Sequence, residues 1–366
     1  MIVGLNALFL RPGKSGGTET YAAGLMRGLL EYAAISRLRV YVGPQAAEWP
    51  LPSDGRVERV VCASAGPGVV RRYLYEQLVL PRRARREGVD VLHSLAYTGP
   101  LRPIVPSVVS VHDLNFRALG HLMSPVRRTA LRFVVGGAMR ASHRILVLSQ
   151  ASQRQIVSAY PWAESRVRVI YIAPRPRLGA QTADVEPPLA RPYLVAFSSQ
   201  SPHKNMARLL EAWELLIAEG VRTHDLVLVG HSPRGADTIR LPPSVRRTGF
   251  VDDATVVQML RAADALVFPS LYEGFGLPVL EAMSLGVPVA SSNAASLPEV
   301  GGAAALYFDP HSVTEMADAM RRLTSDAGLR ARMRAAGLEQ AATFSWSRAA
   351  KETIAAYSDA LAGSLP

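Results

Sequence analysis

The chain has 366 residues, of which 49% are hydrophobic, so it exceeds the usual size of a single core and favours a globular protein with two domains. Its one cysteine, Cys62, excludes an internal disulfide and is typical of a reducing compartment. No apolar run reaches the length of a membrane span.

The net charge of +11 is unevenly distributed along the chain. Residues 1–180 contain 25 of the 41 Lys and Arg residues but 10 of the 30 Asp and Glu residues, so this part carries +15 and the remainder −4. The asymmetry predicts that the N-terminal half meets an anionic partner, which is a phospholipid surface, a lipid-phosphate acceptor or nucleic acid.

Strand-like apolar runs alternate with longer helical patterns in both halves, as in the parallel sheets of doubly wound α/β domains. We expect one domain at residues 1–180, a proline-rich linker at 181–192 and a second domain at 193–345. The strand-like runs are residues 2–10, 37–43, 89–94, 106–113, 144–150, 192–199, 224–231, 265–270, 287–292 and 304–310.

The first apolar run has neither the basic leader nor the cleavage site of a signal peptide, so we expect a buried strand and a cytoplasmic protein. Gly16 and Gly17 follow this run and precede a helical pattern, where exposed amides can bind an anion. A flexible glycine loop is the alternative. The GKS tripeptide at 13–15 is not a phosphate loop, because the Walker A pattern requires glycine at the position of Leu8.

The segment 69–88 combines an apolar helical stripe with clustered arginines. Basic amphipathic helices of this kind can lie on anionic membranes. A solvated charged face above a packed apolar stripe is the commoner arrangement and is the competing interpretation. Any membrane contact of this chain is therefore expected to be peripheral.

His112 and Asp113 end the apolar strand that begins near residue 106, where a side chain projects into a crevice instead of the core. A purely structural histidine is the alternative. The eight histidines are scattered and form neither an HExxH motif nor a pattern with paired cysteines, so the sequence predicts no metal site.

Lys204 stands directly before a helical pattern, and we expect Asn205 to cap that helix. A lysine beside the positive end of a helix dipole is unfavourable unless an anion lies between them. The position therefore predicts a diphosphate site, with a solvated loop lysine as the alternative.

Two carboxylates, Glu273 and Glu281, flank a glycine-rich turn between a predicted strand and a predicted helix. Gly274 and Gly276 carry no Cβ, so their backbone can approach a ligand closely, and the helix start attracts phosphate oxygens. Carboxylates accept hydrogen bonds from hydroxyls, so the segment predicts a site for a nucleotide sugar. Tight packing of the turn and a helix-dipole role for the acids are the competing interpretations.

The motifs GGTETY, VHDL, SPHKN and EGFGLPVLEAMSLGVPVASS occur in this order, and with them the chain closely resembles the retaining glycosyltransferases of family 4. The resemblance covers nearly the whole length and is strongest at residues 249–300, where Glu273 and Glu281 meet the family's E-x7-E signature. It implies the GT-B fold, with two Rossmann-like doubly wound domains facing across a cleft. A final helix at about 346–366 would pack back on the N-terminal domain.

The resemblance also implies roles for individual residues. His112 and Glu273 would be the catalytic residues, both facing the donor sugar. Glu281 would hold the nucleotide ribose and Lys204 the donor diphosphate. The other donor-binding positions that it implies are Gly16, Gly17, Ser198, Val251, Gly274, Phe275, Gly276 and Leu277.

One departure from the family pattern concerns the positive charge around the diphosphate. The family often has arginine at two positions where this chain has Ser198 and His203. A protonated His203 would supply part of the missing charge, and a neutral, hydrogen-bonding ring is the alternative.

The resemblance implies a retaining transferase that needs no metal and no cofactor, because helix amides and Lys204 can stabilise the departing nucleoside diphosphate. We expect it to move a hexose, with mannose as one candidate, from a nucleoside-diphosphate sugar to a glycan or lipid-linked acceptor in cell-surface polysaccharide or glycolipid synthesis. The basic N-terminal domain would allow peripheral contact with an anionic membrane.

Two other functions compete with this one. An epimerase of sugar nucleotides or a phosphorylase with the same fold is the first alternative. A basic, non-enzymatic binder of nucleic acid is a remote alternative. The carboxylates and glycine turns lie in the acidic half, where they would not contribute to binding nucleic acid. We therefore expect no nucleic-acid partner.

Overall fold

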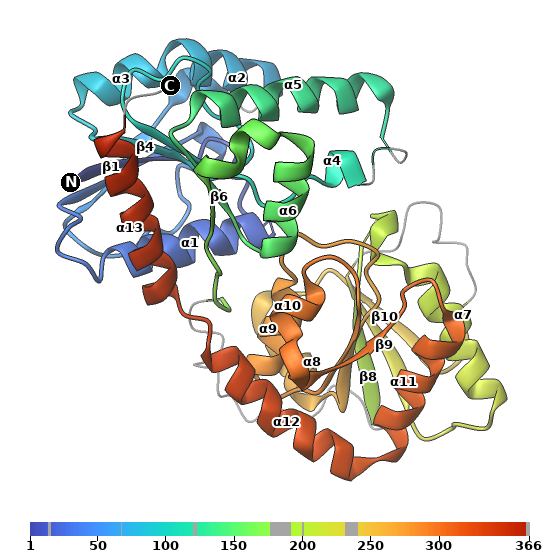
Figure 1. Cartoon of the computed structure of the whole chain (residues 1–366). Coiled ribbons are helices and arrows are strands. Elements are labelled where there is room, and N and C mark those ends of the chain that lie inside the picture. Colours follow the sequence, from blue (N-terminus) through green and yellow to red (C-terminus); the bar gives the residue numbers. More distant parts are fainter. Residues whose placement is uncertain are drawn as a thin grey trace. The chain divides into compact units, whose positions relative to one another are not determined.

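The computed structural model describes residues 1–13, 16–66, 68–118, 120, 123–175, 192–199, 201–230 and 241–363. The chain forms two compact units (Figure 1). Unit 1 comprises Met1–Pro176 and Ser345–Pro366, and unit 2 comprises Arg177–Phe344. The predicted linker at 181–192 lies outside the described residues except for Pro192.

Unit 1 contains a seven-stranded parallel sheet in the order β3-β2-β1-β4-β5-β6-β7. The strand order reverses between β1 and β4, as it does in doubly wound folds. Its strands are β1 (Ile2–Asn6), β2 (Arg37–Val42), β3 (Val57–Val61), β4 (Val91–Ser94), β5 (Ser107–Ser110), β6 (Arg144–Val147) and β7 (Val167–Val169).

Helices follow the strands of unit 1, and most of them bury apolar side chains. The helices are α1 (Gly17–Leu29), α2 (Val69–Leu78), α3 (Leu80–Arg86), α4 (Asn115–Ala118), α5 (Pro125–Ala141), α6 (Gln150–Ala159) and α13 (Trp346–Ala362). Short 3-10 turns lie at Pro44–Ala46, Ala63–Ala65 and Pro161–Arg166.

Unit 2 contains a six-stranded parallel sheet in the order β10-β9-β8-β11-β12-β13. Its strands are β8 (Tyr193–Ser198), β9 (Asp225–Gly230), β10 (Val245–Gly249), β11 (Ala265–Phe268), β12 (Val289–Ser292) and β13 (Ala305–Phe308). Its helices are α7 (Met206–Ala218), α8 (Asp253–Ala262), α9 (Leu277–Ser284), α10 (Leu297–Gly301), α11 (Val313–Ser325) and α12 (Ala327–Ala342), with 3-10 turns at Pro202–Lys204 and Gly302–Ala304.

The predicted fold class, two doubly wound parallel α/β domains, is confirmed, and each predicted apolar run contains a strand. Three strands among the described residues were missed. In β3 and β10 charged residues interrupt the apolar pattern, and both are edge strands, while β7 has three residues. The first predicted strand, residues 2–10, ends at Asn6, and the buried Leu8 and Leu10 lie in the turn that follows.

The last helix, α13, packs on α1 within unit 1. Gly24 and Gly28 of α1 face Trp346, so closely that a Cβ on either glycine would overlap it. The Trp346 indole Nε1 donates a hydrogen bond to the Pro174 carbonyl oxygen at 2.8 Å. This contact joins the segment that leaves unit 1 to the segment that returns to it.

A buried chain of hydrogen bonds also holds α13 in place. His93 of β4 bonds through Nδ1 to the Tyr357 hydroxyl at 2.7 Å and through Nε2 to the Ser110 hydroxyl at 2.8 Å. The Ser110 hydroxyl bonds in turn to the Tyr21 hydroxyl of α1 at 2.7 Å. The helix is thus fixed by polar as well as apolar contacts.

The substitution Gly24→Ala should destabilise the protein, because the added methyl overlaps the Trp346 ring and must displace it from its bond to Pro174. Overpacking of this kind costs about 1 to 3 kcal/mol. Gly68→Ala is the matched control, since a Cβ there meets nothing within 4 Å. Equal urea midpoints for the two variants would show that the contact does not hold α13.

Candidate functional site

The predicted diphosphate lysine and the first predicted carboxylate meet at the strand reversal of unit 2. The order β10-β9-β8-β11-β12-β13 reverses between β8 and β11, which is where doubly wound folds bind ligands beyond the carboxyl ends of the strands. Lys204 follows β8, Glu273 follows β11, and the Lys204 Nζ lies 2.7 Å from the Glu273 Oε1.

This ion pair is only partly open to solvent. The side chain of Lys204 is 18% exposed and that of Glu273 is 16% exposed. The Lys204 Nζ also lies 4.9 Å from the centroid of the Phe268 ring, within the range of a cation–π contact. The amide of Leu271 donates to the His203 carbonyl oxygen at 2.8 Å, so the loops after β8 and β11 are joined through their backbones as well.

The environment of His203 affects whether its ring is protonated or neutral. Burial lowers the pKa of His203 below its usual value. The lowered pKa favours the neutral, hydrogen-bonding ring over a protonated His203. Ser198, the last residue of β8, is buried and carries no charge.

Asn205 does not cap α7 as expected. Its backbone is left-handed, with φ of 60°, and its side chain makes no capping bond. Its Nδ2 instead donates to the carbonyl oxygens of Pro269 at 3.1 Å and Pro310 at 2.7 Å. Asn205 thus ties together the loops that follow β8, β11 and β13.

The glycine-rich turn after β11 has a shape that requires glycine. Gly276 has φ of 102°, and a Cβ there would lie 2.6 Å from the Leu297 Cδ2. The hydroxyl of Ser296 lies 2.9 Å from the Glu273 carbonyl oxygen and 2.8 Å from the Phe275 carbonyl oxygen, so its single proton is shared between the two. Sequence reasoning missed Ser296, although it supports the backbone of the turn.

Helix α9 begins at Leu277, directly after this turn, with Pro278 in its first turn. The first amides of a helix have no partner within the helix, so those of Gly276 and Leu277 are suited to bind an anion. Glu281 is the fifth residue of α9 and is only 2% exposed. Val251 lies between β10 and α8, at the same carboxyl edge of the sheet.

In unit 1, His112 follows β5 and is 8% exposed. Its Nε2 lies 2.8 Å from the Leu95 carbonyl oxygen, which can only accept, so Nε2 carries the proton and Nδ1 is an acceptor. The ring meets Tyr21 edge-on at 4.8 Å and stacks on Tyr97 at 5.8 Å. Burial lowers the pKa of His112 to about 4.

The predicted glycines of unit 1 lie at the start of α1. Gly16 precedes the helix with φ of 51°, and Gly17 is its first residue. Lys14 and Ser15, which belong to the rejected GKS motif, lie outside the described residues. Glu19 of α1 accepts from the Gly13 amide at 3.1 Å and the Trp49 indole at 2.8 Å, which secures the loop on the helix.

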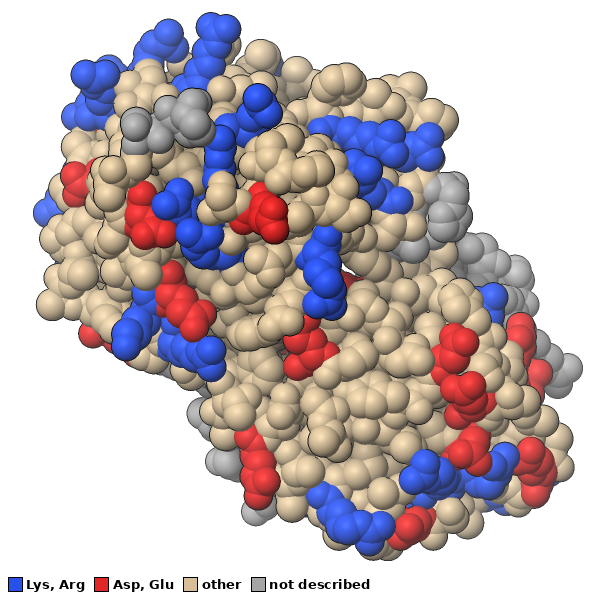
Figure 2. Space-filling view, viewed as in Figure 1, with Lys and Arg blue, Asp and Glu red and all other residues tan. Residues whose placement is uncertain are grey.

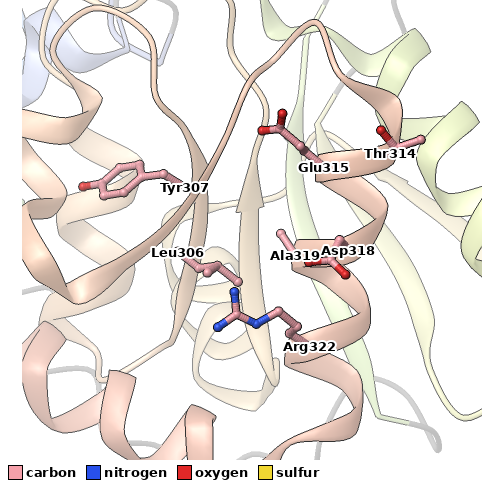
Figure 3. Close-up of a pocket in the computed structure, with 7 residues that line it drawn as sticks. All are labelled: Leu306, Tyr307, Thr314, Glu315, Asp318, Ala319 and Arg322. Carbon is pink, nitrogen blue, oxygen red and sulfur yellow. The ribbon is translucent and has the colours of Figure 1, made fainter.

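A separate pocket of about 330 Å³ lies between β13 and α11 in unit 2 (Figure 3). None of the predicted site residues lines it. Its charged side chains come from α11, where Glu315 also accepts a bond from the Asp309 amide at 2.8 Å. The lining residues are Leu306, Tyr307, Thr314, Glu315, Asp318, Ala319 and Arg322.

Comparisons with known proteins match both units. Residues 15–173 match the family described as Glycosyltransferase Family 4, and residues 191–326 match the family described as Glycosyl transferases group 1. The O-antigen chain mannosyltransferase B of Escherichia coli is 31% identical over 299 residues, which cover 77% of this chain and 78% of that protein.

Two solved structures show the same fold. Sucrose-phosphate synthase from Thermosynechococcus elongatus superposes with a TM-score of 0.74 and 18% identity, covering 98% of each chain. Anabaena HepE in complex with UDP and glucose superposes with a TM-score of 0.68 and 19% identity, covering 98% of this chain and 99% of the other. These likenesses show that the two units have the GT-B architecture.

The buried histidines of unit 1 should make its stability depend on pH. Burial lowers the pKa of His93 to about 3 and that of His112 to about 4, whereas an unfolded histidine titrates near 6.5. As the pH falls from 6.5 towards 4, the unfolded state takes up protons that the folded state does not, so the free energy of unfolding falls. We expect up to about 1.4 kcal/mol per pH unit for each histidine.

Urea denaturation at several pH values between 7 and 5 measures this slope. His93→Gln should lower it by about one histidine's share even though the variant is less stable throughout. A slope that His93→Gln leaves unchanged would contradict the assignment of a neutral, buried His93.

Proposed function

This chain belongs to glycosyltransferase family 4, and we propose that it transfers a hexose, with mannose as the first candidate, from a nucleoside-diphosphate sugar to a glycan or lipid-linked acceptor. The observation that carries the proposal is the contact between Lys204 and Glu273 at the strand reversal of unit 2. The similarity to an O-antigen mannosyltransferase favours mannose and a role in cell-surface polysaccharide synthesis. The complex of HepE with UDP and glucose favours a nucleotide-sugar donor.

The two members of the ion pair would separate their roles when the donor binds. A bound diphosphate can replace Glu273 as the partner of the Lys204 ammonium group. The Glu273 carboxylate can then accept hydrogen bonds from hydroxyls of the hexose. In the ligand-free protein each group neutralises the other, so neither is buried with an unpaired charge.

The nucleotide would be held at the start of α9. The amides of Phe275, Gly276 and Leu277 face the sugar and phosphates in this proposal, with the close approach that Gly274 and Gly276 allow. Glu281 would accept the ribose hydroxyls, and Val251 would border the base.

We propose that no metal is needed, because Lys204 and the helix amides stabilise the charge that develops on the leaving diphosphate. Ser198 and the neutral His203 supply no positive charge at this site. Lys204 would therefore neutralise a larger share of the diphosphate charge than it does in relatives that carry arginine at these positions.

A neutral His112 limits the mechanism. With its proton on Nε2 held by the Leu95 carbonyl oxygen, the ring offers Nδ1 as an acceptor for a sugar hydroxyl and is a poor proton donor. We propose that the acceptor hydroxyl attacks the anomeric carbon from the side of the leaving group. The bond from that carbon to the phosphate oxygen breaks, the new glycosidic bond forms on the same face, and the hydroxyl proton passes to the leaving phosphate.

The N-terminal part of the chain would meet a lipid-linked acceptor. Unit 1 contains the excess of positive charge, with Gly16 and Gly17 at the start of α1 on its phosphate and acceptor side. Among the described residues, no helix combines the length and the apolar character needed to cross a bilayer. We propose that contact with an anionic membrane is peripheral.

The reaction is tested by incubating the protein with α-linked GDP-mannose and a lipid-linked acceptor, and by assigning the product by NMR. An α-linked product that also forms in the presence of EDTA supports retention without a metal. A β-linked product, loss of turnover in EDTA, or epimerisation of the donor without acceptor would each contradict the proposal.

Lys204→Ala should weaken binding of the nucleoside diphosphate by an order of magnitude or more, because a charge-assisted hydrogen bond contributes about 1.5 to 3 kcal/mol. Isothermal titration calorimetry measures this directly. Lys351→Ala is the matched control, since Lys351 is an exposed lysine of α13. Equal affinities of the two variants for the nucleoside diphosphate would show that Lys204 does not bind it.

Glu281→Ala and Glu273→Ala should differ in their effects. Loss of Glu281 should weaken the nucleoside diphosphate and the intact donor alike, because the ribose is common to both. Loss of Glu273 should mainly lower turnover of the intact donor and leave the affinity for the nucleoside diphosphate intact. Identical losses in both assays would contradict the separate roles.

A further inference from the structure

The exposed large apolar side chains of this protein are concentrated on one part of unit 1. Of the thirteen such side chains in the described part of the chain, nine lie in or beside α2, in the loop 99–106 and in α5. They are Val69, Val70, Leu74, Leu78, Val79, Leu101, Ile104, Val126 and Phe133. A cluster of this kind marks an interaction site more often than single exposed residues do.

These three segments, together with α3, which follows α2 directly and contacts it, form one continuous surface, which we call the basic apolar face. Gln77 of α2 donates to the Gly99 carbonyl oxygen at 3.0 Å and accepts from the Leu101 amide at 2.8 Å. Leu101 packs against Gly137 of α5, where a Cβ would lie 2.8 Å from its Cδ2. The loop therefore bridges α2 and α5.

The apolar stripe of α2 is not packed in the core, as the commoner interpretation of segment 69–88 expected. Val70, Leu74 and Leu78 follow one another at intervals of four residues, on one side of the helix, and are 71%, 54% and 57% exposed. The buried side of α2 instead carries Tyr75 and Glu76. A helix that turns its leucines outward requires a partner for them or loses their hydrophobic contribution.

The charges of the same face are positive apart from Glu87 at the end of α3, which is partly buried and pairs with Arg83 at 2.8 Å. Segments 69–86, 99–106 and 125–141 contain one acidic residue, Glu76, which is 2% exposed and bonded to Asn6 and Thr98. Figure 2 shows blue side chains along the upper edge of unit 1, where α2, α3 and α5 lie in Figure 1. The exposed arginines of these segments are Arg71, Arg82, Arg85, Arg86, Arg102, Arg132 and Arg140.

We propose that the basic apolar face docks on a bilayer that contains anionic lipids. Leucine, valine and phenylalanine side chains bury their apolar surface at the acyl boundary, while arginines meet the phosphate headgroups. Val126 and Phe133 of α5, 81% and 77% exposed and two helical turns apart, would enter the same layer. The proposal concerns the partner of unit 1 and is independent of the site in unit 2.

Charge complementarity favours this partner over the others. A second copy of the chain would bring one set of arginines against another, which is repulsive. The phosphates of nucleic acid would pair with the arginines but would not bury the nine exposed aliphatic and aromatic side chains of the face. Anionic lipids satisfy both kinds of side chain at once.

Docking would also bring the site in unit 1 close to lipid-linked molecules. Glu76 is on the inner side of α2 and accepts hydrogen bonds from the side chains of Asn6, the last residue of β1, and Thr98. Helix α2 thus links the basic apolar face to the carboxyl edge of the sheet, where the strand order of unit 1 reverses. This part of the inference rests on the proposed function.

The test is flotation of the full chain with phosphatidylcholine vesicles that contain or lack phosphatidylglycerol. We expect binding to the anionic vesicles that weakens as salt is added. An Arg82→Gln, Arg85→Gln, Arg86→Gln variant should bind about a hundredfold more weakly, since each arginine near an anionic surface contributes about a factor of five. A Leu74→Ser, Leu78→Ser variant should lose at least several-fold in affinity.

Matched controls replace residues of similar exposure on other helices, and they should float as the unchanged protein does. The controls are Leu338→Ser with Leu361→Ser, and Arg332→Gln with Arg334→Gln and Arg348→Gln. All variants should keep the nucleoside diphosphate affinity of the unchanged protein in calorimetry, which separates this test from that of the proposed function.

Three results would overturn the proposal. The first is failure of the full chain to float with anionic vesicles at low salt. The second is equal loss of binding in the face variants and in the controls. The third is concentration-dependent self-association, seen by analytical ultracentrifugation, that the two-leucine variant abolishes, because a second copy would then cover the face.

Discussion

The ion pair between Lys204 and Glu273 is the interaction on which the account of this protein rests. Two loops that are 69 residues apart in the chain bring a lysine and a carboxylate to 2.7 Å only because β8 and β11 are neighbours in a parallel sheet. The attraction between the two charges offsets the cost of removing each of them from water. A ligand that carries both a diphosphate and hydroxyls can break this pair, because its diphosphate can bind Lys204 and its hydroxyls can bind Glu273.

The loops around the pair are joined by buried hydrogen bonds where the ligand would need precise contacts. Asn205 and Ser296 are buried; Asn205 donates to carbonyl oxygens of two neighbouring loops, and Ser296 shares its one proton between two carbonyl oxygens of the turn after β11. These bonds give four loop carbonyl oxygens a fixed partner without adding charge. The left-handed Gly276 then allows α9 to start at a point where its amides face the same edge of the sheet.

Much of this arrangement follows from patterns within short windows of sequence. Apolar runs and helical spacing predicted the doubly wound class and ten of the thirteen strands in the part of the chain that the structure describes, and the ends of those strands carried Lys204, Glu273 and His112. The roles of Asn205 and Ser296 could not be predicted in this way, because their hydrogen bonds reach residues up to 105 positions away. The exposure of the apolar stripe of α2 could not be predicted either. The helical pattern shows that a stripe exists but does not show which side of the helix meets the core.

Lys204 and Glu273 are proposed to hold a nucleotide sugar between them, and a crystal structure of the protein with a nucleoside-diphosphate hexose would reveal these contacts. The account predicts the Lys204 Nζ within hydrogen-bonding distance of a diphosphate oxygen and the Glu273 carboxylate bonded to hydroxyls of the hexose. A complex in which the donor lies elsewhere while the Lys204–Glu273 pair stays intact would contradict the account.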